Sequence, residues 1–489
     1  MASGARGDKA ADPKASWWSS KWGLPWTPDQ FVKAAVVAGH PFASLDLLPA
    51  ELKEALEAHL VGDWDEIRRD RLEWCARRFS DWKSLLKLEA ESRKGLDPEM
   101  ARVIKDKKLL LCKDMLMEAG HPDTVLPSMF LQGFELTGDV QASGVFRPAF
   151  EPATLCEDDL LAMAPEANLA TIQSTRSSGK QNIDRGVWEK TMEEVDKGWL
   201  RGPLQASSVL ASGVVTRRFG VEQGVDEKGP KVRPIDDFSA SLINSTVSTE
   251  EKISLHTLDV LGAVVACWMQ RACSRLEDAR LVGRAYDLKA AYRQLPLSPG
   301  ARRFAFVSVF NPTEANAAVF GLSCLPFGAI ASVHHFLRSA AALWKILVKC
   351  GRLLTTSYFD DFPLVTPPAL EESCASFIQM VFRLTGWLFA TEGGKAGDFA
   401  QIFSVLGAEL DLREVHRGLF VLGNTQRRLN ELVETIEMYL EAGTIGKSEA
   451  QRLRGRLGFA ESLTFAAARV PWLSSVSRSM RMLSLSSLR

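Results

Sequence analysis

The chain has 489 residues, of which 46% are hydrophobic and 24% are charged. These values are typical of globular proteins, so they exclude a disulfide-stapled miniprotein, a fibrous repeat and a wholly disordered chain. Because 59 Lys and Arg residues nearly balance 60 Asp and Glu residues, any bound polyanion must be held by a local basic surface and not by the overall charge.

Residues 1–16 are small and polar, with little to bury, so we expect a disordered tail. This start lacks the apolar core of a secretory signal, and apolar stretches such as residues 260–269 are shorter than the roughly 20 residues of a membrane span. The eight cysteines contain no CxxC pair. We therefore expect an intracellular protein of the nucleus or cytoplasm, with reduced cysteines and no membrane partner.

Residues 17–120 are expected to form an all-helical N-terminal region. Apolar residues recur at helical spacing from Leu48 onwards, and Asp97 is a natural N-cap for the helix that follows it. Acidic and basic residues alternate closely here, which is typical of a solvated helix face and less often of a nucleic-acid surface. We assign this region no chemistry.

Residues 121–184 carry frequent Pro and Gly between short apolar pieces, which predicts a linker that holds a domain boundary. Residues 185–423 then alternate short strand-like runs with helices, which predicts an α+β domain. Strands are expected at residues 303–310 and 353–365, and long helices at residues 332–351 and 370–389.

Residues 424–489 return to helical periodicity, with Gly443 as a helix end and Ser448 as a cap for the next helix. Arg452 and Arg456 are four residues apart, so they share one face of that second helix. Such a face can follow a nucleic-acid backbone, and it can equally be a solvated surface.

Two adjacent carboxylates, Asp360 and Asp361, interrupt an apolar run at what the pattern predicts to be a hairpin tip. Adjacent carboxylates repel each other unless a cation neutralises them, so one interpretation is a divalent-metal site and the other a solvated turn. Asp287 ends another apolar segment. If that strand lies beside the hairpin, the carboxylates can hold two Mg²⁺ ions in the geometry used for nucleotidyl transfer.

Several motifs in this order resemble those of reverse transcriptases. Tyr358-Phe359-Asp360-Asp361 is similar to the YxDD signature, and the segment from Asp287 to Tyr292 is similar to the preceding DxxxAY motif. The remaining similarities are the fingers motif at 231–237, LPxG at 325–328, the late palm lysine at Lys395 and the primer-grip strand at 403–410. The LPFG form and the helical residues 453–462 most resemble retrotransposon enzymes of the DIRS or gypsy kind.

The resemblance implies a right-hand polymerase, with fingers and a ferredoxin-like palm of antiparallel sheet in residues 185–423 and a helical thumb in residues 424–489. It implies RNA-directed DNA polymerase activity, in which deoxynucleoside triphosphates extend a primer on an RNA or DNA template. Asp287, Asp360 and Asp361 would be the catalytic residues and would hold two Mg²⁺ ions, or Mn²⁺ in their place.

The resemblance also implies a set of nucleotide contacts. These residues are Lys231, Arg233, Tyr292, Phe327, Gly328 and Lys395. Lys231 and Arg233 would hold the β- and γ-phosphates, and Tyr292 would exclude a ribose hydroxyl. Phe327 and Gly328 would pack under the base and the template. Without the resemblance, the basic pair is also typical of a surface and Tyr292 of a core.

Two alternatives to this function remain open. An RNA-directed RNA polymerase shares the carboxylates but should not carry a bulky side chain at Tyr292. A domesticated copy would bind nucleic acid without catalysis, although all three carboxylates are present. Pro363 also departs from a regular strand, because proline lacks a donor, so we expect the second hairpin arm to be short, edge-like or bulged.

Overall fold

Two of the N-terminal helices begin at aspartates whose side chains satisfy free N–H groups of the first turn. The Asp63 side chain accepts a 2.9 Å hydrogen bond from the N–H of Glu66, and Asp97 caps the following helix as predicted. The helices of this part are α2 (Ala50–Val61), α3 (Trp64–Ser92), α4 (Pro98–Val103), α5 (Leu109–Glu118) and α6 (Leu126–Gln132).

The computed structural model describes residues 48–210, 213–226, 229–391 and 397–467. The expected tail at 1–16, the first part of the expected helical region, Lys395 and residues 468–489 lie outside the described residues. All described residues belong to one compact unit, Pro41–Ala467.

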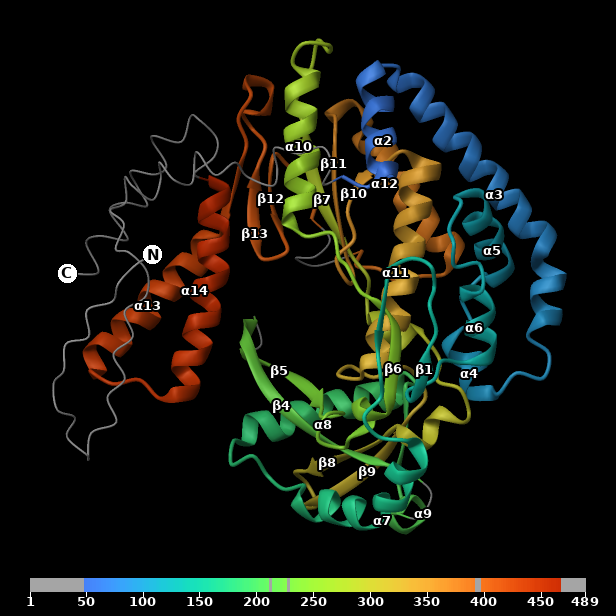
Figure 1. The fold of residues 1–489 in the computed structure, drawn as a ribbon, viewed down its shortest axis with the longest axis vertical. Helices are drawn as coiled ribbons and strands as arrows, with labels where there is room; N and C mark the ends of the chain where they lie inside the picture. Colours follow the sequence, from blue (N-terminus) through green and yellow to red (C-terminus); the bar gives the residue numbers. More distant parts are fainter. Residues whose placement is uncertain (1–47, 211–212, 227–228, 392–396, 468–489) are drawn as a thin grey trace, which may run out of the picture. The chain divides into compact units, whose positions relative to one another are not determined.

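The N-terminal helices share a core with the helices that follow. α3 packs along α12 (Glu371–Thr385), and the ring centroids of Trp74 and Phe377 are 5.1 Å apart. The buried guanidinium of Arg71 donates a 2.7 Å hydrogen bond to the carbonyl of Gly351, the last residue of α11 (Ile330–Gly351). Figure 1 shows α2 and α3 beside α11 and α12. The N-terminal helices therefore cover the two long helices of the central domain.

Residues 121–184 are ordered, so the expectation of a loose linker was wrong. They hold α6, β1 (Gly138–Val140), β2 (Arg147–Glu151), α7 (Glu157–Ser174) and the first residues of α8 (Gln181–Asp196). β1 and β2 pair on either side of β6 (Val247–Lys252). Pro127 lies in the first turn of α6, where a missing N–H is tolerated, and Gly133 has a positive φ just after that helix. Pro and Gly here separate short elements.

The largest sheet has the strand order β3-β9-β8-β4-β5. Its strands are β3 (Leu200–Leu204), β4 (Val215–Asp226), β5 (Gly229–Asp236), β8 (Phe306–Asn311) and β9 (Asn316–Leu322), and α9 (Ala206–Leu210) follows β3. β4 and β5 form a long antiparallel hairpin against which α8 packs. The strand expected at 303–310 begins at Phe306, because the 3-10 helix η5 (Ala301–Phe304) precedes it.

A second sheet, in the order β10-β11-β7, contains β7 (Val282–Asp287), β10 (Leu354–Thr355) and β11 (Asp361–Thr366). β11 is the central strand and pairs with β7 without a register shift although it contains Pro363, so the edge-like and bulged forms expected for this arm were wrong. The Pro363 carbonyl accepts a 2.9 Å hydrogen bond from the N–H of Thr356. Because the nitrogen and the carbonyl of one strand residue face the same neighbour, the missing donor faces short β10 and removes no bond to β7.

The two long helices of the domain occur close to their predicted ranges. α11 matches the prediction for 332–351, whereas α12 ends at Thr385 because Gly386 adopts a left-handed φ of 74°. α10 (Leu258–Ala272) precedes β7. The described domain is therefore a mixture of helices and sheets, as expected.

The last described elements are a small sheet and two helices. They are β12 (Ile402–Val405), β13 (Ala408–Asp411), β14 (Val421–Asn424), α13 (Gln426–Ala442) and α14 (Lys447–Ala467). Gly443 ends α13 as predicted, with a φ of 66°, and α14 begins one residue before Ser448. Across the described ranges, no helix combines the length and apolarity that crossing a bilayer requires.

Candidate active site

Strand pairing brings the predicted carboxylates together. Asp287 ends β7, Asp361 begins β11, and the two residues are direct partners in the antiparallel pairing. Directly opposed side chains share one face of a sheet, with Cβ atoms about 5 Å apart. The N–H of Leu288 also donates a 2.9 Å hydrogen bond to the carbonyl of Asp360. The two segments therefore converge, with Asp361 directly opposite Asp287.

A tight turn holds the acidic pair at the hairpin tip. The N–H of Tyr358 donates to the Asp361 carbonyl at 2.9 Å, and the N–H of Asp361 donates to the Tyr358 carbonyl at 3.0 Å. Phe359 carries a φ of 51°, in the left-handed region that favours glycine. Its side chain packs against the main core, which offsets the strain of this turn.

His256 is hydrogen-bonded to Ser357, just before the hairpin turn, a contact that the sequence analysis missed. Its ring Nδ1 accepts a 3.2 Å hydrogen bond from the backbone N–H of Ser357, and its backbone N–H donates to the Ser357 carbonyl at 3.3 Å. Burial lowers the pKa of His256 to about 4, so Nδ1 stays an acceptor at neutral pH. No motif signals this residue, because the contact joins positions far apart in the chain.

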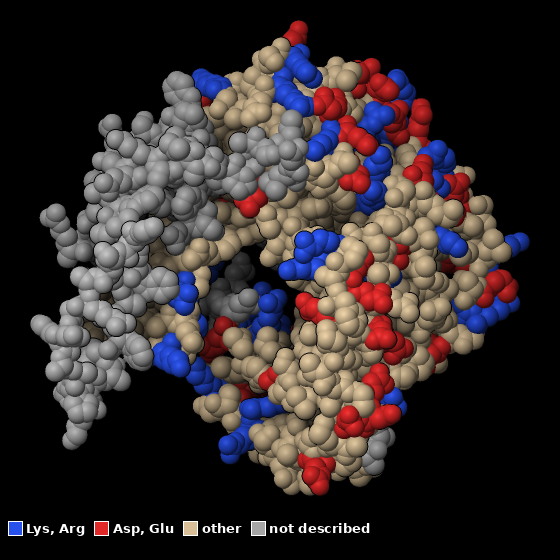
Figure 2. All heavy atoms as spheres, viewed as in Figure 1, with Lys and Arg blue, Asp and Glu red and all other residues tan. Residues whose placement is uncertain are grey.

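A cleft of about 800 Å³ opens beside Asp287 and Asp361. Its other walls are the turn between β12 and β13, the start of α10, and Phe459 and Leu463 of α14. The ring of Phe403 fills the space over Gly283, where an added Cβ would lie 2.0 Å from a ring carbon. Figure 2 shows a hollow in this face of the molecule, with both basic and acidic side chains around it. The expected primer-grip segment therefore forms one wall of the cleft.

Tyr292 belongs both to the core and to the neighbourhood of the carboxylates. It lies in the short helix η4 (Ala291–Gln294) and is only 7% exposed, with its ring centroid 4.6 Å from that of Phe327 and 4.9 Å from that of Phe336. Burial, and then the charge of Asp360, raise the pKa of Tyr292. The structure therefore places this side chain within electrostatic reach of Asp360.

Gly328 must be a glycine for two reasons. Its φ is +92°, and an added Cβ would lie 2.6 Å from the carbonyl oxygen of Asp236. The Asn244 side chain donates to the Gly328 carbonyl at 3.0 Å and accepts from the N–H of Ile330 at 2.9 Å. Gly328 therefore makes a close backbone approach to β5, while the neighbouring Phe327 is exposed.

The other predicted contact residues are more scattered. Lys231 and Arg233 are exposed on β5, two residues apart and thus on one face, with buried Val232 between them. Arg452 is exposed on α14. Arg456 instead joins α14 to α13, because its guanidinium bonds to the Thr435 hydroxyl at 3.1 Å and lies 3.6 Å from the Glu431 carboxylate.

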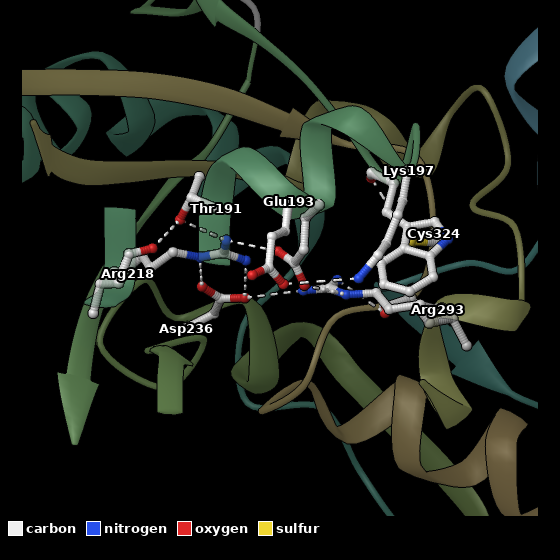
Figure 3. Close-up of polar contacts among 11 residues, drawn as sticks. Thr191, Glu193, Lys197, Arg218, Asp236, Arg293 and Cys324 are labelled. Atoms are coloured by element: carbon white, nitrogen blue, oxygen red, sulfur yellow. Dashed lines mark hydrogen bonds and ion pairs between the residues drawn. The ribbon is translucent and has the colours of Figure 1, made fainter. Parts of the chain in front are cut away.

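A buried ion network ties the β4–β5 hairpin to the helix that carries Tyr292 (Figure 3). Arg218 of β4 donates to Asp236 of β5 at 2.7 and 3.0 Å and to Glu194 of α8 at 2.7 Å. Arg293, next to Tyr292, donates to the same Glu194 at 2.9 Å. Burial opposes the ionisation of Glu194, but the two arginines outweigh it and lower its pKa. Sequence reasoning missed this network.

The carboxylates suit a hard divalent cation chemically, because Mg²⁺ prefers oxygen ligands. Asp287 and Asp361 line one wall of the cleft, and Asp360 lies in the turn just before Asp361. Within the described residues, no group of three or more His, Cys, Asp or Glu side chains already has metal-binding spacing. The structure thus supplies a paired set of suitable ligands.

No protein-family model and no curated protein sequence matches the chain. Among solved structures, it is similar to the foamy viral protease-reverse transcriptase dRH in complex with double-stranded DNA. The identity is 13% and the TM-score 0.39, over 71% of this chain and 52% of that one. A foamy viral protease-reverse transcriptase with an RNA/DNA hybrid is similar at 12% identity and a TM-score of 0.40, over 63% and 37%.

The chain therefore spans about half or less of the length of these two proteins. Both TM-scores are below 0.5, so a functional assignment has to stand on the motifs and on the geometry of the site.

Proposed function

We propose that the chain is an RNA-directed DNA polymerase that adds deoxynucleoside triphosphates to a primer on an RNA or DNA template. The observation that carries the proposal is the direct pairing of Asp361 with Asp287 at the wall of a cleft. The proposal includes a right-hand arrangement, with the β4–β5 hairpin in the fingers, the β10-β11-β7 sheet in the palm, and α13 and α14 in the thumb. The LPFG form at 325–328 favours a retrotransposon enzyme of the DIRS or gypsy kind.

In this proposal Asp287, Asp360 and Asp361 hold two Mg²⁺ ions, and Mn²⁺ can take their place. When bound, these ions supply activation of the primer 3′-hydroxyl and neutralisation of the triphosphate. The antiparallel pairing and the tight turn hold the carboxylates in place before the substrate arrives. Phe403 and the turn after it form another part of the cleft wall, where the primer end would lie.

The remaining residues bind and orient the nucleotide. Lys231 and Arg233, both exposed, hold the β- and γ-phosphates as fixed positive charges. Tyr292 limits the space at the sugar C2′ and so favours deoxynucleotides. Phe327 lies under the incoming base, with Gly328 beside the template.

Two further roles concern the leaving group and the duplex. Lys395 gives a proton to the pyrophosphate leaving group. Arg452, on the exposed side of α14, and Arg456, on the side that faces α13, contact the nucleic-acid backbone.

Primer extension by the purified full chain tests the proposal. We expect Mg²⁺-dependent incorporation of dTTP on a polyriboadenylate template with an oligothymidylate primer. Asp360→Asn should abolish the product, whereas Asp158→Asn, an exposed residue in the first turn of α7, should leave it unchanged. A preference for ribonucleotides would assign the chain to RNA polymerases. If the wild type forms no template-dependent product, only the alternative of nucleic-acid binding without catalysis remains.

A further inference from the structure

A second groove lies between the N-terminal helices and the end of α12. It has a volume of about 750 Å³ and is lined by one side of α3, by residues 105–108 and by residues 382–391. None of its lining residues also lines the cleft beside Asp287. The N–H of Lys289, at its edge, bonds to the Leu388 carbonyl at 2.9 Å, so the groove adjoins the loop that follows the carboxylate strand.

The lining of this groove is strongly basic. Its cationic members are Arg93, Lys105, Lys107, Lys108, Lys289 and Arg383, and among the described residues its only lining carboxylates are Glu89 and Asp106. Glu89 is already bound, because it accepts from Arg93 at 2.9 Å and from the N–H groups of Leu109 and Leu110 at 2.8 and 2.9 Å. Positive charge is therefore in excess.

Lys107 forms part of the floor of the groove. Lys107 is 4% exposed, and its ammonium donates to the Gln294 side chain at 3.0 Å and to the Gly386 carbonyl at 3.1 Å. It also lies 3.5 Å from the ring centroid of Trp387. These partners are neutral, and in the described chain no carboxylate forms an ion pair with Lys107 or Lys108. Burial lowers the pKa of Lys107 well below its ordinary value, so the charge offered to an anion comes from the exposed cations of the groove.

Apolar and aromatic side chains lie between the charges. Trp82 is half-buried, and the Lys108 ammonium is 5.2 Å from its ring centroid. Leu86 and Leu388 are each 48% exposed, so the groove also presents apolar surface. Exposed cations beside an aromatic face are the combination that binds phosphates and stacked bases of a single strand.

We propose that this groove binds a single strand of nucleic acid. The backbone lies along the exposed Lys105, Lys289 and Arg383, and bases pack on Trp82 and the two leucines. Binding here requires neither the carboxylates nor nucleotide addition, so it goes beyond the proposed polymerase activity. It also gives a role to α3 and the loop before α5, to which the sequence assigned no chemistry.

Charge reversal tests the proposal in the full chain. We expect Lys105→Glu with Arg383→Glu to raise the Kd for a labelled oligothymidylate roughly tenfold in fluorescence anisotropy and to lower the salt slope by about 1.4. The matched control is Arg69→Glu with Lys113→Glu, two exposed cations outside the groove. Both double variants should keep the wild-type melting temperature, since the four side chains are exposed.

Photocrosslinking locates the bound strand. With 4-thiothymidine in the oligonucleotide, we expect crosslinked peptides that contain Trp82 or residues 383–391, and loss of the Trp82 peptide in the charge-reversal variant. Crosslinks confined to the cleft residues 358–361 and 403–407, or an unchanged Kd after charge reversal, would overturn the proposal. Equal displacement by polyglutamate would overturn it too, because it would show an acidic protein segment as the occupant. Asp360→Asn should not alter the groove crosslink. Primer extension therefore tests the polymerase proposal, and the crosslink tests the groove, independently of each other.

Discussion

At the scale of single residues, the structure explains why some positions accept only one amino acid. Gly328 combines a left-handed φ with a close approach to the Asp236 carbonyl. We expect Gly328→Ala to lower the free energy of unfolding by roughly 1–3 kcal/mol, because it strains the backbone and separates β5 from the start of α11. Urea denaturation measures the change.

Gly443→Ala is the matched control for that substitution. Gly443 has a φ of 66°, but no atom lies within 4 Å of an added Cβ. Gly443→Ala should lower the free energy of unfolding by roughly 1 kcal/mol, the effect of the backbone conformation alone. Equal costs at the two glycines would contradict the close approach that we describe.

Tyr292 is the residue whose proposed role depends most on its surroundings. We expect Tyr292→Ala to raise ribonucleotide incorporation relative to deoxynucleotide incorporation, because the ring near Asp360 no longer limits the space at C2′. The ratio is measured with both substrates in one preparation, so loss of the packing with Phe336 does not affect it. An unchanged ratio would leave Tyr292 with only its core role.

At the scale of elements, buried charges join α8, β4, β5 and η4. The Arg218 side chain is 0% exposed and bonds to both Asp236 and Glu194. We expect Arg218→Met to destabilise the protein by roughly 3–5 kcal/mol, because it leaves two buried carboxylates with too few partners. Chemical denaturation followed by circular dichroism checks this.

Arg185 provides the comparison within α8. It pairs with Glu189 at 2.7 Å, but its side chain is 75% exposed. Arg185→Met should change stability by less than about 0.5 kcal/mol, since exposed pairs contribute little. If Arg218→Met were as mild as Arg185→Met, the network would not hold the hairpin to η4.

The elements that could be predicted from the sequence are those with long-range periodicity or a strong end signal. α11 and α12 have sustained apolar periodicity, and Gly443 and Asp97 mark helix ends through their own backbone and side-chain chemistry. Within 121–184, α6, β1 and β2 were missed because three- to seven-residue pieces between Pro and Gly look like loops locally, and the longer α7 was missed because Pro165 interrupts its helical pattern. Pro363 is tolerated in the central strand because its missing N–H faces β10, which has only two residues, and the sequence does not show that β10 is so short.

In the candidate site, too, some features could be predicted from the sequence and others could not. The carboxylates were predictable, because adjacent acids in an apolar run are unusual and a known motif order surrounds them. That Asp361, not Asp360, is the direct partner of Asp287 follows from strand register, which the local pattern does not set. The contact of His256 with Ser357 and that of Glu194 with Arg293 join distant positions and carry no local signal.

At the scale of the whole molecule, buried histidines set the response to acid. Burial is the main cause that lowers the pKa of His59 and His335 to about 3 and of His121 and His256 to about 4, from an ordinary value of 6.5. Below pH 6.5 the unfolded chain therefore binds more protons than the folded one. The free energy of unfolding should fall as the pH decreases from 6.5 to 4.

Urea denaturation at pH 7, 6 and 5 measures this response. The hydrogen bond with Arg302 is the main cause that lowers the pKa of Asp97 to about 2. Such a carboxylate loses its contribution to stability only below its ordinary pKa of 3.8, outside this pH range. A free energy of unfolding that stays constant from pH 7 to 5 would contradict the neutral, buried state of these histidines.

The central claim is that two strands far apart in the chain form one cation site. Electron paramagnetic resonance with Mn²⁺ tests it without requiring turnover. We predict that the full chain binds Mn²⁺, that Asp287→Asn and Asp361→Asn each weaken binding, and that Asp158→Asn does not. Mn²⁺ affinity that is unchanged in both Asp287→Asn and Asp361→Asn would contradict the shared site and, with it, the proposed mechanism.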